Sequence, residues 1–105
     1  MKIYVISPSM HANQALMKHI ALYKPETIRE VRKTQRRIVL INDDVIYFRN
    51  GAHSLDGIRA DVAVGYMVDY DFLEMITCAS KETKRAWCLT DLEVYIDEIR
   101  EATHE

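Results

Sequence analysis

The sequence contains only three glycines in 105 residues, and none of them belongs to a glycine-rich loop that ends in Lys and Ser or Thr. Such a loop cradles the phosphates of a nucleotide with backbone amides and helps to position magnesium. We therefore expect no hydrolysis of ATP or GTP by this chain alone. The two cysteines, Cys78 and Cys88, do not form a CxxC pair, and the four histidines are scattered. This pattern indicates no zinc site, no metal and no other cofactor, and it favours two reduced, partly buried thiols over a disulfide.

Long apolar runs and an excess of charge of one sign are also missing. No apolar run is long enough to cross a bilayer, and the first ten residues have too short an apolar length for a signal peptide. A cytoplasmic protein is the simplest expectation. Because the formal net charge is only −2, the chain as a whole is not expected to attract nucleic acid or anionic membranes. A length of 105 residues suits one domain, residues 1–105, with a single core.

What the sequence does contain is a series of short β-rich and amphipathic segments. Residues 2–6 and 61–68 are almost wholly apolar, which is typical of strands buried in a sheet. Ser7 or Ser9 can cap a helix after the first of these strands, and Pro25 ends that helix. The spacing predicts a helix there with one apolar face toward the sheet.

A β-hairpin is predicted in the middle of the chain. Residues 37–41 and 45–49 are β-rich and flank a polar turn. Together these segments predict a small α/β domain with a mainly parallel sheet, in which residues 2–6 lie beside residues 62–68. Helices are expected on both faces of the sheet, and the hairpin is expected to extend the sheet or to project from it.

Three other segments carry weaker signals. Residues 26–37 are charged and fit either a short helix or an exposed loop. The short apolar run 86–89 suits an edge strand, after a polar segment. Thr90 and Glu93 have the spacing of a capping box, which predicts the start of a last amphipathic helix.

The order of these motifs resembles part of a known ATPase core. Residues 5–9 (VISPS) are a strand that ends in Ser-Pro, and Gln14 follows in the next helix. The polar-turned hairpin 37–48 comes next, and residues 54–62 hold Leu, Gly and Arg before a strand that begins Ala-Asp. This order resembles the core of viral terminase large subunits and related helicase-like P-loop enzymes. The resemblance covers residues 2–68 and implies a fragment of a RecA-like fold.

The same resemblance implies that the chemistry of the family is missing. The phosphate loop of the family precedes the first strand, and this chain starts too late to hold it. The family's Asp-Glu pair, which serves the metal and the attacking water, falls on Tyr66 and Met67, which can do neither. The resemblance therefore implies a degenerate, phage-encoded or otherwise viral pseudo-ATPase fragment that is kept for its surface.

Acidic side chains are the first candidates for chemistry, because carboxylates that meet near strand ends can hold magnesium. The four candidates are Asp43, Asp44, Asp69 and Asp71. Turn formation by the first two and helix capping by the last two explain the same residues, and we favour that interpretation.

Nucleophilic chemistry finds little support. His53, Ser54 and Asp56 are neighbours in sequence, but no nucleophile elbow is present, so we expect no hydrolase site. Cys88 follows basic residues that would lower the pKa of its thiol, although packing beside Trp87 is the favoured role.

Aromatic residues and methionine are concentrated around the hairpin and the strand at 61–68. A core role explains most of them, but any that reach the surface would form a protein-binding patch, because Tyr and Met are enriched at interfaces. The candidate protein-binding residues are Tyr47, Tyr66, Met67 and Tyr70. The leading hypothesis for function is therefore a non-catalytic protein-binding module.

Self-association, most simply as a homodimer, is the expected form of such binding. The hairpin 37–49 is expected to offer edge strands with unpaired backbone groups, which template pairing with another chain. Arg36, Arg37 and Arg49 oppose this pairing by charge, and the acidic last helix of a neighbouring copy would offset them.

A dense basic run supports the alternative function, an accessory nucleic-acid-binding protein. Its members are Arg29, Arg32, Lys33, Arg36 and Arg37. Such a run can neutralise phosphates, but it lacks interleaved aromatic residues for base stacking, and a solvated surface explains it as well.

Overall fold

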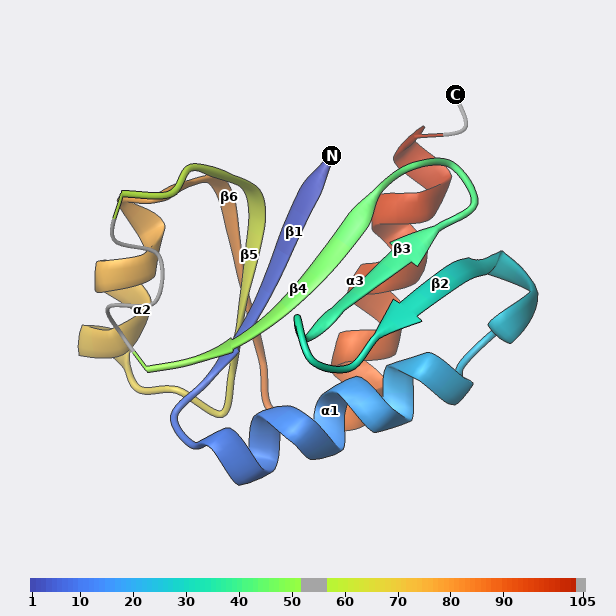
Figure 1. Ribbon diagram of the computed structural model, residues 1–105. Coiled ribbons are helices and arrows are strands. Elements are labelled where there is room, and N and C mark those ends of the chain that lie inside the picture. Colours follow the sequence, from blue (N-terminus) through green and yellow to red (C-terminus); the bar gives the residue numbers. More distant parts are fainter. Residues whose placement is uncertain (52–56, 104–105) are drawn as a thin grey trace.

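The computed structural model describes residues 1–51 and 57–103, and in that part the side chains as far as Ile99. The chain is an α/β domain whose described residues form one sheet of six strands with three α-helices around it (Figure 1). The elements, in chain order, are β1 (Lys2–Ser7), α1 (Met10–Leu22), a 3-10 turn (Pro25–Thr27), β2 (Ile28–Arg32), β3 (Arg37–Leu40), β4 (Val45–Asn50), β5 (Ala60–Tyr66), α2 (Tyr70–Thr77), β6 (Ser80–Ala86) and α3 (Leu89–Thr103).

The sheet is mixed but mostly parallel, and its strand order is β2-β3-β4-β1-β5-β6. Strand β1 lies at its centre and pairs in parallel with β4 on one side and with β5 on the other. Strands β5 and β6 are also parallel, whereas β2, β3 and β4 form antiparallel pairs. The predicted parallel neighbourhood of residues 2–6 and 62–68 is confirmed, with Ile3 opposite Val62. The hairpin extends the sheet through β4.

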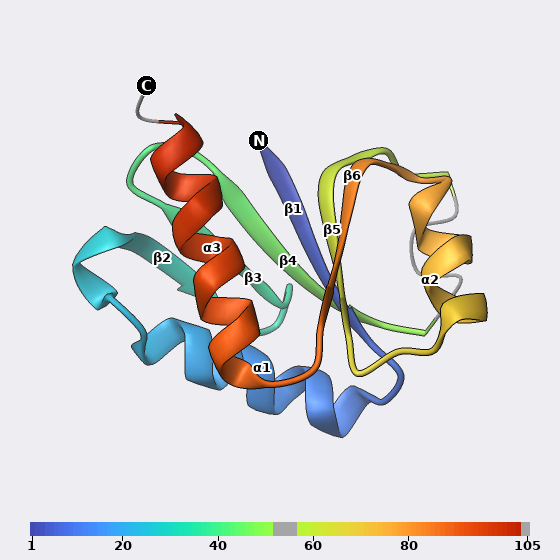
Figure 2. The same ribbon diagram turned by 180° about the vertical axis from the view of Figure 1, so that it is seen from behind.

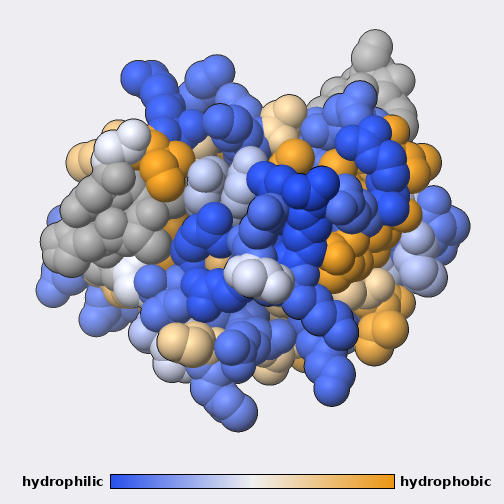
Figure 3. Space-filling model, in the orientation of Figure 1, coloured by the Kyte–Doolittle hydropathy of each residue, from blue (hydrophilic) through white to orange (hydrophobic). Residues whose placement is uncertain are grey.

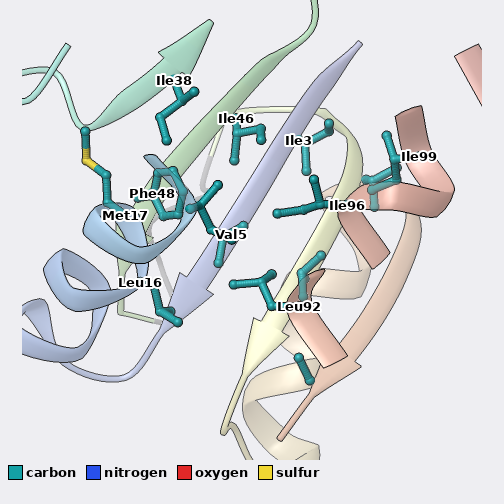
Figure 4. Close-up of a cluster of buried hydrophobic side chains, with 14 of the residues drawn as sticks. Ile3, Val5, Leu16, Met17, Ile38, Ile46, Phe48, Leu92, Ile96 and Ile99 are labelled. Atoms are coloured by element: carbon teal, nitrogen blue, oxygen red, sulfur yellow. The ribbon is translucent and has the colours of Figure 1, made fainter. Parts of the chain in front are cut away.

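Helices lie on both faces of the sheet, as predicted. Helices α1 and α3 lie on one face and α2 on the other, as the two opposite views show (Figures 1 and 2). The larger core fills the space between the sheet and the pair α1 and α3, with Phe48, Ile96 and Leu16 among its buried side chains (Figure 4). A smaller core lies under α2, around Ile6 and Ile76. The apolar pattern of β1 follows from this arrangement, because both of its faces are buried.

Helix caps agree with two sequence predictions and contradict a third. The Ser9 hydroxyl accepts a hydrogen bond from the Ala12 amide at 3.1 Å and caps α1. The Asp69 carboxylate accepts a hydrogen bond from the Phe72 amide at 2.9 Å and caps α2. The capping box at 90–93 was wrong: α3 begins at Leu89, so Thr90 and Glu93 lie inside the helix.

Two of the weak segments are strands, contrary to expectation. Residues 26–37 form neither a helix nor a loop alone, since Ile28–Arg32 pairs with β3 as strand β2. The last edge strand is not at 86–89 but is the polar segment Ser80–Ala86 itself. Both strands are edges of the sheet, where charged side chains remain in water and no alternating apolar pattern is required. That is why periodicity missed them.

The hairpin 37–49 does not provide a free edge, so the predicted route to a dimer was wrong. Strand β3 pairs with β2 on its outer side, and β4 pairs with β1. Ile38, Leu40 and Ile46 are buried in the chain's own larger core. The edges of the sheet are β2 and β6, which carry mostly charged side chains.

Cys78 and Cys88 are both free thiols, but both are exposed, so the expectation that they are partly buried was wrong. Cys78 follows α2 directly, and Cys88 lies between β6 and α3. Within the described part of the chain, no helix combines the length and the apolar character that a membrane span requires.

Candidate functional site

The carboxyl ends of β1 and β5 are a natural place to look for a binding site. These two strands are parallel neighbours, but α1 leaves β1 toward one face of the sheet and α2 leaves β5 toward the other (Figures 1 and 2). Open α/β sheets commonly bind ligands outside the strand ends at such a switch point, because the two connections diverge there. The residues after β1, β5 and β6 therefore define the carboxyl edge of this domain.

The centre of this edge is closed by Asn13. Its side chain is buried, and Nδ2 donates hydrogen bonds to the carbonyls of Val5 at 3.3 Å and Arg49 at 2.7 Å. The amide thus ties α1 to the ends of β1 and β4. Its Oδ1 is buried and has no hydrogen-bond partner. Because that free atom is an acceptor, it does not favour an anion at the start of α1.

Beside this closed centre, three large side chains are exposed on the carboxyl edge. Met67 is 55% exposed, Tyr70 72% and Trp87 53%. They follow the neighbouring strands β5 and β6, and the Met67 amide donates to the Ala86 carbonyl at 2.8 Å, which holds the two connections together. We call Met67, Tyr70, Arg85 and Trp87 the edge surface.

Arg85 is the centre of the edge surface. Its guanidinium carbon lies 4.5 Å from the centroid of the Tyr70 ring and 4.0 Å from that of the Trp87 ring. Its Nε and Nη2 both donate to the Val68 carbonyl, at 3.0 and 2.7 Å. The planar guanidinium therefore fixes both rings relative to the backbone after β5, through contacts that a lysine could not reproduce.

The four predicted protein-binding residues do not form one patch. Met67 and Tyr70 lie together on the edge surface, but Tyr66 packs against the larger core on the α3 side of the sheet. Tyr47 stacks on Tyr4, with ring centroids 4.6 Å apart and an interplanar angle of 14°. The aromatic residues of the hairpin and of β5 are thus divided between opposite faces of the sheet.

Sequence reasoning missed Arg85 and misjudged Trp87. Trp87 was considered only as a packing partner for Cys88, whereas its ring is half-exposed over Arg85 and Cys88 is exposed. The only available signal was the pair of aromatic residues, at 70 and 87, that follow two successive strand segments. The two aromatic residues can be recognised as neighbours only if residues 80–86 are known to form a strand parallel to β5. The polar composition of residues 80–86 does not predict a strand.

The predicted basic run is divided by the strands that carry it. Arg29 is paired with Asp43, and Arg32 with Glu30. Lys33 lies in the turn between β2 and β3. Arg36 and Arg37 instead meet Arg49 of β4 around a hollow of about 460 Å³, whose lining is Thr34, Gln35, Arg36, Arg37, Tyr47 and Arg49.

A second, mostly apolar hollow of about 500 Å³ lies between α1 and β2. Leu22, 75% exposed, and Val31, 37% exposed, are on its wall. Lys18 and Lys33 also line it. Nothing in the described residues indicates what would occupy this hollow.

The acidic candidates for a metal site are separated. Asp43 and Asp44 lie in the turn that precedes β4, at the opposite end of the sheet from Asp69 and Asp71. Asp44 is buried and paired with the N-terminal amine at 3.0 Å. Within residues 1–51 and 57–103, no three His, Cys, Asp or Glu side chains come close enough together to hold a metal ion. His53, Ser54 and Asp56 lie outside the described residues, as does part of the loop on which the terminase resemblance rests.

Comparison with known proteins gives no further guidance. No protein-family model matches the chain, and neither a curated protein nor a solved structure shows significant similarity to it. The class of the molecule is therefore defined by its fold, an α/β domain with a mostly parallel sheet. Its function has to be argued from its own surface.

Proposed function

We propose that this chain is a non-catalytic protein-binding module that binds through the edge surface. The carrying observation is the exposure of Met67, Tyr70 and Trp87 around a fixed Arg85 at the carboxyl edge of the sheet. The partner is a protein surface, either a second copy of this chain or a different protein. The terminase resemblance and a viral origin remain predictions.

The chemistry of the edge surface supports this proposal. Trp, Tyr and Arg are the residue types most enriched among interface hot spots, and Met is enriched at interfaces in general. Aromatic side chains lose little conformational entropy when they become buried, and here Arg85 already holds two of them in place. Binding can therefore cover a large apolar area with little additional ordering.

The position of the surface supports a binding role more than a catalytic one. Its Arg85 is engaged with the Val68 carbonyl, so this guanidinium is a scaffold for the rings. Asp69 caps α2, and the Asp91 carboxylate accepts from the Trp87 amide at 3.0 Å. Asp69 and Asp91 therefore have structural roles, and we place no nucleophile, base or metal on the edge surface.

The single tryptophan of the chain makes the proposal directly testable, because Trp87 reports from the middle of the surface. For a homodimer, light scattering should show a mass that rises from one chain to two across micromolar concentrations. The Trp87 emission should shift to the blue over the same range as the ring leaves water. A copurifying protein added to the monomer should produce the same shift if the partner is foreign.

Two variants locate the contact. Tyr70→Ala removes a ring, and Met67→Gly removes a side chain while easing a residue that has a φ of +52°. Each should weaken the association at least tenfold, whereas Leu22→Ala, at an exposed apolar residue on α1, should leave it unchanged. A monomeric mass at all concentrations, together with partner capture that survives Tyr70→Ala, would refute the proposal.

A further inference from the structure

One half of the sheet has a face that no described helix covers. Helices α1 and α3 lie on one face, and on the other α2 lies against β5 and β6, away from β2, β3 and β4 (Figures 1 and 2). Figure 1 looks onto the face of β2, β3 and β4 that is left open. The centre of the same view is predominantly hydrophilic (Figure 3). We call this part of the sheet the open face.

Strand alternation decides which side chains the open face carries. Ile38 and Phe48 are buried in the larger core, so their neighbours Arg37, Tyr47 and Arg49 point to the opposite side of the sheet. Arg37 is directly opposite Tyr47 in the antiparallel pair of β3 and β4. Residues far apart in sequence are thereby brought into one basic and aromatic row.

Three arginines line the hollow of about 460 Å³. Arg37 and Arg49 reach it from the open face, and Arg36 reaches it from the turn at the edge, where it also lines the apolar hollow beside α1. Arg36 Nη2 donates to Asn50 Oδ1 at 2.8 Å, which fixes its guanidinium near the end of β4. Arg49 lies over the Tyr47 ring, 5.4 Å from the centroid, and its Nη1 donates to the Phe48 carbonyl at 3.0 Å. The site is therefore ordered by neutral partners that leave its positive charge in place.

No described carboxylate forms an ion pair with Arg36, Arg37 or Arg49, and none lines the hollow. Glu30 is bound to Arg32, which is the main reason that the pKa of its carboxyl is lowered, and the charge of Arg37 makes a smaller contribution in the same direction. The Arg37 Nε is buried and donates to no described residue. Burial, and then the charge of Arg49, lower the pKa of Arg36. A cluster of like charges with an unused donor is destabilising unless an anion neutralises it.

Arg36 has a left-handed backbone conformation, as Lys24, Asp43 and Met67 also do. Its φ is +50°, in the left-handed region, where a residue with a side chain costs about 1 kcal/mol relative to glycine. The turn between β2 and β3 would be less strained with glycine at this position.

We propose that Arg37 and Arg49 on the open face, together with Arg36 at its edge, form a site for the backbone phosphates of a nucleic acid. The planar guanidinium forks match phosphate oxygens, and three of them can serve neighbouring phosphodiesters. Base stacking on Tyr47 is not part of the site, because Tyr4 and Arg49 already occupy the faces of that ring. Sequence preference is therefore expected to be weak.

This site differs from the basic run predicted from the sequence. Arg29 and Arg32 belong to that run but are neutralised by Asp43 and Glu30. Arg49 does not belong to the run and joins the site only through the pairing of β3 with β4. The site shares no residue with the edge surface, so its test is independent of the proposed protein-binding function.

The test is a fluorescence-anisotropy titration of labelled single-stranded and double-stranded oligonucleotides over a series of salt concentrations. Contact with three phosphates should give a slope of log K against log salt of about −2 for a single strand, at about −0.7 for each phosphate. Excess pyrophosphate separates the two sources of phosphate. If it displaces the oligonucleotide stoichiometrically and binds as tightly, the site takes free phosphate and the nucleic-acid proposal is overturned.

Arg36→Gly is the decisive variant, because glycine adopts the left-handed φ freely and the fold should be retained. It and Arg37→Gln should each weaken binding at least fivefold and make the salt slope shallower. Arg29→Ala is the matched control, with an exposed and already paired arginine, and should change affinity less than twofold. In the unmodified chain, the Arg37 Nε proton resonance should shift on titration. No binding at low salt, or equal losses from Arg29→Ala and Arg36→Gly, would overturn the proposal.

Discussion

The guanidinium of Arg85 lies against the ring of Trp87, 4.0 Å from its centroid, while it donates two hydrogen bonds to the carbonyl of Val68. One side chain from β6 thus holds both the end of β5 and the ring that follows β6. The exposed rings are consequently part of the folded framework, and the same contact links stability to the proposed binding function.

The first prediction concerns this link. Arg85→Ala should destabilise the protein by about 1 to 3 kcal/mol, because it removes charged hydrogen bonds to a partly buried carbonyl and a stacking contact. Urea unfolding followed by circular dichroism measures the loss. Arg85→Lys should recover only part of it, since an ammonium cannot reproduce the planar fork. Arg59→Ala, at an exposed arginine, is the control, and an equal loss from Arg59→Ala would contradict the prediction.

Asn13 should be nearly irreplaceable. Asn13→Ala leaves the Val5 and Arg49 carbonyls without this donor and opens a cavity between α1 and the strand ends, so we expect a loss of about 2 to 4 kcal/mol. Asn13→Asp should be worse at neutral pH, because it would bury a carboxylate against two carbonyls. Thermal unfolding midpoints provide the measurement. The neighbouring exposed residue gives the control Gln14→Ala, and a shift as large there would count against the role of Asn13.

Gly65 of β5 lies where Val68 and α2 pack tightly against the sheet. A Cβ at this position would lie 2.6 Å from Val68 Cγ2, 3.2 Å from Leu73 Cδ1 and 3.3 Å from Ile76 Cδ1. Val68 is buried and stiff, so it cannot move away cheaply. We expect Gly65→Ala to cost about 1 to 3 kcal/mol by overpacking, as measured by urea unfolding. Gly57→Ala is the control, because a Cβ there meets open space and only the backbone strain of a φ of +76° would act. Gly65→Ala should therefore cause the larger change in the NMR signals of α2.

A pH dependence is expected at Asp61. The Lys2 amide, at 2.7 Å, and then Lys81, at 3.2 Å, hold the pKa of its carboxyl below the ordinary value. A lowered folded pKa contributes stability that is fully present above the pKa of the unfolded group, about 4, and is lost as pH falls through the folded pKa. Asp61→Asn should therefore reduce the difference between the free energies of unfolding measured at pH 7 and at pH 3. An unchanged difference would show that Asp61 contributes nothing to acid unfolding.

Much of the fold could be predicted from local patterns. The apolar runs of β1 and β5 indicated a sheet buried on both faces, and both strands proved to be parallel neighbours. Ser9 and Asp69 were recognisable as helix caps, because a short polar side chain before an amphipathic run can satisfy the first free amides. Such signals are local, and they survive in sequence because each acts over a few residues.

The edge strands could not be predicted in the same way. Strand β6 has charged residues on both sides, and its partner β5 lies 20 residues earlier in the register that pairs Ala60 with Ser80. An edge strand is stabilised by backbone pairing with its neighbour and not by an apolar face of its own. Because β6 was not predicted, the position of Trp87 beside Arg85 and Tyr70 could not be predicted either. The edge surface was therefore not recognisable from the sequence.

The sequence by itself determined the α/β class, the central strands and the absence of a phosphate-binding glycine loop, because these follow from composition and short-range pattern. Only the tertiary structure decided which charges are neutralised and which are not. Arg29 and Arg32 form ion pairs with acidic residues. Arg36 and Arg37 instead lie beside Arg49, which is thirteen residues after Arg36 in the sequence, because β3 pairs with β4. Charge balance at a site depends on distances in space, and those distances are set by strand register.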